Sequence, residues 1–292
     1  MRSTLMFMTA GLAAATLALA GCAGDPGASG GGTTYEVASD VTLEGSPTFD
    51  AMKSDGTVTV GVKEDQPGLG YLDAATGERS GFDIEIAKWI AASLGFSADK
   101  INYTAIPSAN REAAIVNGDI DYYVGSYSIT DKRKDQVGFA GPYFETGQQL
   151  LVKADNETIT GPDDLTAGVS VCSATGSTPI QNIRANYPDV KPVEFDTYSQ
   201  CVDALRDGQV DAVTTDGAIL IGYAAQNPEE LKVVGEPFST ERYGVGLPKD
   251  DAALRHFVNA MFTDGGSTWT SIYDATLGKS GTKVAQPAVD DY

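Results

Sequence analysis

Residues 57–62 read TVTVGV and run directly into the Gly/Pro-rich loop QPGLG of residues 66–70. A short β-branched run that ends in such a loop predicts a buried strand. Residues 82–94 then place apolar side chains at helical spacing, and Gly95 ends the predicted helix. Strand, loop and helix form the first unit of an alternating pattern, which predicts an α/β fold.

The alternation continues along most of the chain. Further strands are predicted over residues 101–106, 120–124, 168–172, 193–195, 210–214, 232–234 and 244–248. Further helices are predicted over residues 108–117, 178–185, 199–207, 217–226 and 250–262. The length of 292 residues suggests about two domains.

Charge and motif content exclude several functions. The chain has 20 Lys+Arg against 40 Asp+Glu and a formal net charge of −20, which repels nucleic-acid phosphates. Its single histidine leaves little basis for a His-rich metal site or a catalytic triad. No P-loop, dinucleotide-binding, zincin or nucleophile-elbow motif occurs in the sequence. We therefore expect no metal, no cofactor and no catalytic residue.

The N-terminus is typical of an exported protein. Arg2 and the apolar run of residues 5–20 predict a signal peptide over residues 1–21. The sequence Leu-Ala-Gly before Cys22 resembles the lipobox of bacterial lipoproteins, in which the cysteine carries the lipid. An ordinary signal peptide with a chance cysteine is the alternative. We expect an extracytoplasmic protein, anchored to the cell membrane by lipidated Cys22, with a flexible linker over residues 22–45.

Export also affects the two remaining cysteines. In an oxidising compartment, Cys172 and Cys201 are expected to form a disulfide. Two free buried thiols are the alternative.

Two loops at the ends of predicted elements carry groups suited to an anion. Residues 125–133, GSYSITDKR, follow a strand and end in Arg133, whose planar fork matches a carboxylate. Residues 175–178, TGST, open a helix, where free N–H groups favour an anion. Loops at strand ends form the ligand crevice of open α/β sheets, so one ligand between two lobes is predicted. A solvated loop arginine is the alternative.

Four motifs resemble family 3 of the bacterial solute-binding proteins, the polar amino-acid receptors of ABC importers. They are GFDIEIA at 81–87, SYSITDKR at 126–133 with FAGPY at 139–143, VDAVTTD at 210–216, and GVGL at 244–247. The resemblance implies a two-lobe periplasmic-binding-protein type II fold with two hinge strands and a central ligand cleft. Lobe 1 would comprise residues 46–145 plus 243–292, and lobe 2 residues 146–242.

The same resemblance implies roles for individual residues. Arg133 would bind the α-carboxylate of an amino acid, with help from Ser128 and the backbone of Thr178. Asp216 would bind the α-ammonium together with Ser126. An aspartate that caps the following helix is the alternative for Asp216.

Two further cations bear on the ligand's side chain. Lys63 and Arg111 stand where glutamate/aspartate-binding members contact the distal carboxylate. Local pairs are the alternatives: Arg111 with Glu112, and Lys63 with its neighbours Glu64 and Asp65. Three cations and one carboxylate complement glutamate, whereas glutamine would leave two cations without an anionic partner.

The sequence thus predicts a monomeric binding protein without catalysis. Its ligand would be glutamate, possibly aspartate, and its partners a permease and a separate ATPase subunit. Alternatives are binding of glutamine, asparagine or another polar amino acid, and a dehydratase-like enzyme with Glu64 or Asp65 as its acid or base. A receptor's extracellular sensor is a further alternative, but it would need a following membrane segment.

Overall fold

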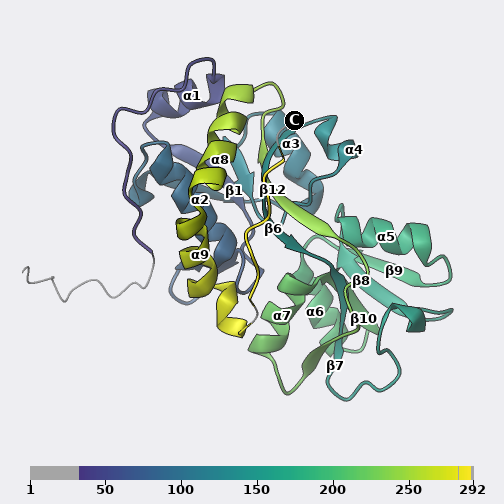
Figure 1. Ribbon diagram of the computed structural model, residues 1–292. Coiled ribbons are helices and arrows are strands. Elements are labelled where there is room, and N and C mark those ends of the chain that lie inside the picture. The colour runs from purple at the N-terminus through teal and green to yellow at the C-terminus, as the bar shows by residue number, and fades with distance from the viewer. Residues whose placement is uncertain (1–32, 282, 291–292) are drawn as a thin grey trace, which may run out of the picture. The chain divides into compact units, whose positions relative to one another are not determined.

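Two five-stranded sheets, each flanked by helices, organise the protein (Figure 1). The computed structural model describes residues 33–281 and 283–290. The predicted signal peptide and Cys22 lie outside these residues. Within the described ranges, no helix combines the length and apolarity needed to cross a membrane. The predicted α/β fold with two lobes is confirmed.

The first sheet has the strand order β4-β1-β5-β12-β6. Its strands are β1 (Val58–Val62), β4 (Ile101–Ala105), β5 (Tyr122–Val124), β6 (Gly138–Thr146) and β12 (Glu241–Leu247). β1 runs parallel to β4 and β5, and β12 runs antiparallel to β5 and β6. The helices that accompany this sheet are α1 (Pro47–Asp55), α2 (Phe82–Ser93), α3 (Arg111–Val116), α4 (Asp131–Lys134), α8 (Ala252–Asp264) and α9 (Gly266–Ala275). A small hairpin pairs β2 (Tyr71–Leu72) with β3 (Arg79–Ser80).

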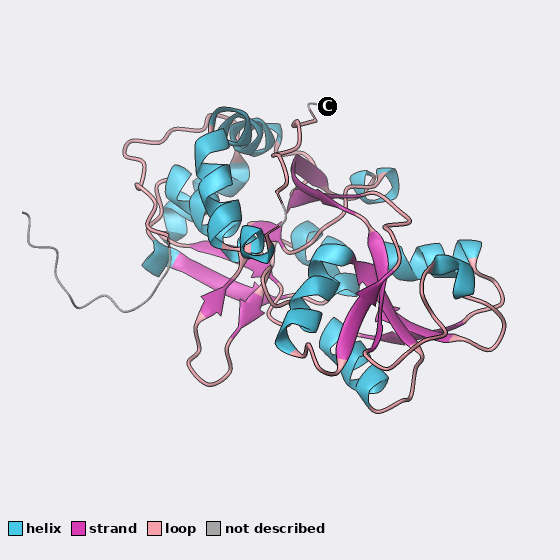
Figure 2. Ribbon diagram, turned by 60° about the horizontal axis from the view of Figure 1, so that its bottom comes forward, coloured by secondary structure: helices cyan, strands magenta, loops and turns pink. Residues whose placement is uncertain are grey.

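The second sheet has the strand order β11-β7-β10-β8-β9. Its strands are β7 (Gln148–Lys153), β8 (Ser170–Ala174), β9 (Lys191–Phe195), β10 (Ala212–Asp216) and β11 (Leu231–Val234). Its helices are α5 (Thr178–Asn186), α6 (Tyr198–Arg206) and α7 (Gly217–Gln226). Figure 2 shows the strands in two groups with helices around each.

Packing around α2 brings the first loop to the sheet. Phe82, the first residue of α2, contacts the rings of Phe144 and Trp269 at centroid distances of 5.4 and 5.8 Å. Gly81 precedes it with φ +112°, and a Cβ there would lie 2.2 Å from the Leu69 carbonyl oxygen. Only glycine fits so close to the loop. The loop that follows β1 is therefore held against the N-terminus of α2.

The chain passes between the sheets twice, from β6 to β7 and from β11 to β12. This agrees with two hinge strands, and the residue limits of the lobes stay a prediction. Two residues in the second half of the predicted flexible linker contact α2. Tyr35 Oη donates to Glu85 Oε2 at 2.8 Å, and the Ala38 N–H donates to the Ala92 carbonyl at 2.9 Å. These contacts hold residues 35–38 against α2.

The two cysteines within the second sheet's elements are bonded. Cys172 lies in β8 and Cys201 in α6, and a disulfide joins them, as predicted. Both are fully buried. The bond ties a central helix of this lobe to the sheet beneath it.

Candidate functional site

Two parallel strands present the first half of the site. β1 and β5 are neighbours in register, with Val62 beside Val124, so their C-terminal ends reach the same edge of the sheet. Lys63 follows β1 directly, and the loop 125–128 follows β5. The loop is unusual because Ser126 has φ +45°. Its N–H donates to Asp83 Oδ2 at 2.9 Å, which holds this left-handed turn in place.

Lys63 and Arg111 meet at one serine. Lys63 Nζ donates to Ser108 Oγ at 2.9 Å, and Arg111 Nε donates to the Ser108 carbonyl at 3.0 Å. The two cations are 5% and 2% exposed. Nothing in the described part of the chain forms a salt bridge with either of them. The alternatives in which they pair with neighbouring carboxylates are therefore wrong.

The neighbouring carboxylates have other partners. Glu112 forms an ion pair with Arg133, whose Nε lies 3.2 Å from Glu112 Oε1. Glu64 pairs with Arg79 at 3.3 Å on the surface. Asp65 Oδ2 accepts from the Ser199 N–H at 3.1 Å. Both carboxylates that the enzyme alternative needs are thus engaged in structural contacts.

Arg133 connects the two halves of the site. Its Nη1 donates to the Ser128 carbonyl at 2.6 Å, within the first half. Its Nη2 donates to the Gly176 carbonyl at 3.1 Å, at the loop before α5. Arg111 Nη2 reaches the same carbonyl at 3.5 Å. Both guanidinium groups therefore face the loop that precedes α5.

The second half of the site consists of Thr178 and Asp216. Thr178 is the first residue of α5, and its hydroxyl donates to Glu241 Oε2 at 2.8 Å and lies 3.4 Å from Ser128 Oγ. Asp216 ends β10 and is 3% exposed. Its Oδ2 accepts from Tyr243 Oη at 2.6 Å, whereas its Oδ1 has no hydrogen-bond partner among the described residues. The side chain does not cap α7, so the capping alternative is wrong.

Burial shifts the pKa values of three of these groups. Desolvation, and then repulsion by Arg111, lowers the pKa of Lys63 to about 7. The same two causes lower the pKa of Arg133 to about 10. Desolvation, and then repulsion by Glu241, raises the pKa of Asp216 to about 8. The site therefore contains ionisable groups whose charge a ligand can change.

Five of the seven predicted binding residues line one small cavity. They are Arg111, Ser126, Ser128, Thr178 and Asp216. The cavity has a volume of about 10 Å³. Lys63 does not line it but lies behind Ser108, and Arg133 lines an adjoining cavity of about 210 Å³. A ligand the size of an amino acid can enter only if the two halves separate.

Two residues that the sequence analysis does not single out belong to this site. Gln66 is fully buried, and its Oε1 accepts from Ser126 Oγ at 2.8 Å. Gln66 thus contacts Ser126, for which binding of the ligand's ammonium together with Asp216 stays a prediction. Tyr127, between the two serines, lies against both arginines. Its position between the two serines of the sequence SYS could have identified it as a site residue, but a tyrosine of the hydrophobic core can occupy the same position.

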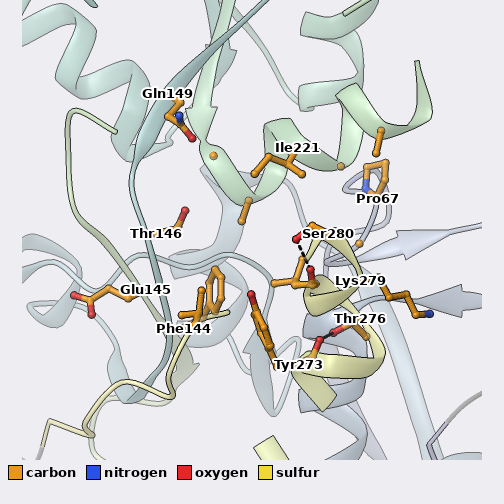
Figure 3. A pocket seen from close by; sticks show the side chains of 17 residues that line it. Pro67, Phe144, Glu145, Thr146, Gln149, Ile221, Tyr273, Thr276, Lys279 and Ser280 are labelled. Carbon is orange, nitrogen blue, oxygen red and sulfur yellow. Dashed lines mark hydrogen bonds between the residues drawn. The ribbon is translucent and has the colours of Figure 1, made fainter. Parts of the chain in front are cut away.

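A further cavity, of about 380 Å³, lies elsewhere (Figure 3). Its walls are mostly apolar and include Phe144, Ile221, Tyr273 and Leu277. None of the seven predicted binding residues lines it. Its chemistry does not suit a charged amino acid.

The chain is similar to several characterised proteins. It is 43% identical over 235 residues to the glutamate-binding protein GluB of Corynebacterium efficiens, covering 76% of this chain and 80% of that one. It is 40% identical to a glutamine-binding protein of Geobacillus stearothermophilus, covering 80% and 87%. An ancestral arginine-binding protein bound to arginine superimposes with a TM-score of 0.69 at 37% identity, covering 75% and 97%.

The family comparison covers most of the chain. Residues 58–276 match a family model, which spans both sheets and every predicted binding residue. The four motifs on which the resemblance in the sequence rests all lie within these residues. The chain belongs to the bacterial extracellular solute-binding proteins, family 3.

Proposed function

We propose that this protein is the substrate-binding component of an ABC importer and that it binds an acidic amino acid, glutamate or aspartate, between its lobes. The ligand's α-carboxylate would bind Arg133, Ser128 and the Thr178 backbone, and its ammonium would bind Asp216 and Ser126. Arg111 and Lys63 would attract the distal carboxylate. The protein would be anchored through Cys22 and would deliver the ligand to a permease driven by a separate ATPase subunit.

One observation carries the proposal: Arg111 and Lys63 are buried cations without a carboxylate partner. A buried charge without a counter-ion is costly, and an anionic ligand group removes that cost. Opposite them, Asp216 Oδ1 is a buried acceptor without a donor. One distal carboxylate, shared by the two cations, and one ammonium satisfy all three, and an acidic amino acid carries both groups.

Other ligands fit this distribution of charge less well. Arginine would bring a second cation to a site that already holds three. Glutamine is the second candidate, because a Lys63 pKa lowered to about 7 reduces the need for an anion beside it. Similarity to a glutamine-binding protein at 40% identity supports the same candidate. The family consists of binding proteins, so no catalytic step is required.

Calorimetry with glutamate, aspartate, glutamine and arginine tests the proposal. We expect micromolar or tighter glutamate binding and a loss of about 30-fold or more in Arg111→Ala, because one charged partner is removed. Arg184→Ala is the matched control, since this arginine is exposed and paired with Glu194. Equal affinity for glutamine, together with an unaffected Arg111→Ala variant, would contradict acidic specificity.

A further inference from the structure

The two arginines of the site share one aromatic ring. The Cζ atom of Arg111 lies 4.4 Å from the ring centroid of Tyr127, and that of Arg133 lies 4.9 Å from it. Both distances are within the range of cation–π attraction. Tyr127 is fully buried between Ser126 and Ser128. A single side chain therefore contacts both guanidinium groups.

The ring lies where two like charges meet. Arg111 and Arg133 donate to the same carbonyl oxygen, that of Gly176, so their guanidinium groups are neighbours. Arg111 lowers the pKa of Arg133, which reflects their repulsion. Glu112 offsets the charge of Arg133 alone. A second carboxylate would stabilise Arg111, but it would also neutralise the charge that an anionic ligand needs.

An aromatic face offers a different solution. Its quadrupole attracts a cation without carrying a net charge, so both guanidinium groups are stabilised and remain available to carboxylates. The position of this ring is fixed by packing. Tyr123 and Phe139 contact it at centroid distances of 5.4 and 4.7 Å. On another side, a Cβ at Gly246 would lie only 2.9 Å from its Cε1.

The hydroxyl of Tyr127 contributes little to this arrangement. It lies near Glu112 without a hydrogen bond of ordinary geometry, and it has no partner among the described residues. The geometry points to Tyr127 as a positioning residue whose ring holds Arg111 and Arg133 side by side for a ligand with two carboxylates. The inference rests on the proposed function and adds a determinant of its specificity for an acidic side chain.

Three variants separate the ring from the hydroxyl. Tyr127→Phe retains the aromatic face, and we expect its glutamate affinity to stay within about 3-fold of the parent. Tyr127→Leu and Tyr127→Met lose that face but stay apolar, and we expect a loss of about 10-fold or more. The loss should be smaller for glutamine, which has no second carboxylate, so the glutamate-to-glutamine affinity ratio should fall. A purely structural defect would weaken both ligands alike.

Fluorinated phenylalanines at position 127 provide a test that preserves shape. Each added fluorine weakens the ring's attraction for cations, so glutamate affinity should fall stepwise with fluorine number. An unchanged ratio in both the Leu and Met variants, no trend with fluorination, or a loss in Tyr127→Phe equal to that in Tyr127→Leu overturns the inference. A parent protein that does not bind glutamate overturns the proposed function, and this inference with it.

Discussion

At the scale of single residues, the site depends on charges that are buried before any ligand arrives. Lys63 donates to Ser108, is repelled most by Arg111, is attracted by Asp65, and is affected less by Arg133 and Asp83. A group in this position is easily deprotonated, because burial penalises its charged form. The ligand's carboxylate has the opposite effect. Binding and protonation of Lys63 are therefore linked.

The linkage predicts the pH dependence of glutamate affinity. An anion raises the pKa of Lys63 above its free value of about 7, so affinity should fall as pH rises above about 7, by at most tenfold per unit. Bound ammonium lowers the pKa of Asp216 below about 8, so affinity should also fall as pH drops below about 8. Calorimetry between about pH 6 and 9 measures both limbs.

Lys63→Met tests whether the fall in glutamate affinity at high pH is due to Lys63 and the fall at low pH to Asp216. The variant should lose the decline on the alkaline side and keep the decline on the acidic side. Titration of the ligand itself affects parent and variant equally. Parallel profiles on the alkaline side would show that Lys63 is not linked to binding.

At the scale of elements, the disulfide joins a strand and a helix of the second sheet's lobe. It spans 29 positions between β8 and α6. A cross-link stabilises mainly by restricting the unfolded chain, and for this loop length the effect is about 3 to 4 kcal/mol. The same lobe contributes Thr178 and Asp216 to the site. Because the cross-link acts mainly on the unfolded chain, its loss should change the free energy of unfolding more than the geometry of the site.

The Cys172→Ala/Cys201→Ala double variant should lose about 3 to 4 kcal/mol of unfolding free energy, measured by urea denaturation. Reductant should lower the midpoint of the parent protein and leave that of the variant unchanged. If the parent unfolds identically with and without reductant, while two free thiols titrate, the bond does not contribute to stability.

At the scale of the whole molecule, elements of the two lobes touch on both sides of the cleft. On one side, Asp65 accepts from the Ser199 N–H at 3.1 Å, and the Tyr223 hydroxyl donates to the Asp65 carbonyl. On the other side, Gly176 has φ +77°, and a Cβ there would lie 2.7 Å from the Cα of Ala109. Such contacts stabilise the closed arrangement independently of the ligand.

Asp65→Ala should therefore weaken glutamate binding. The hydrogen bond from the Ser199 N–H to the Asp65 side chain is lost, which reduces the closed population and raises the apparent Kd about 5-fold. Glu64→Ala is the matched control, because this adjacent carboxylate pairs with Arg79 on the surface. Tyr223→Phe removes the hydrogen bond to the Asp65 carbonyl, which Asp65→Ala retains. It changes no charge and should also weaken binding. Equal glutamate affinities in all three variants would show that the contacts of Asp65 with Ser199 and Tyr223 do not stabilise the closed arrangement.

Prediction from sequence succeeded where local chemistry dominates. The predicted bounds of the helix Gly217–Gln226 agree with the structure, because its apolar run is nearly continuous. Strands β6 and β7 and helices α1 and α9 were not predicted. β7, QQLLVK, lacks regular alternation, and α1 has little apolar periodicity. Their structure depends on packing against distant partners.

The sequence by itself determined the family, the α/β order and the residue types of the site, because motifs and periodicity are local. Only the tertiary structure decided which charges are neighbours. Glu112 pairs with Arg133, although Arg111 is adjacent in sequence, because the helix turns the two side chains apart. Tyr127 lies against both arginines because β5 delivers its loop beside α3. Burial then sets their electrostatics, since desolvation acts only once distant segments have packed.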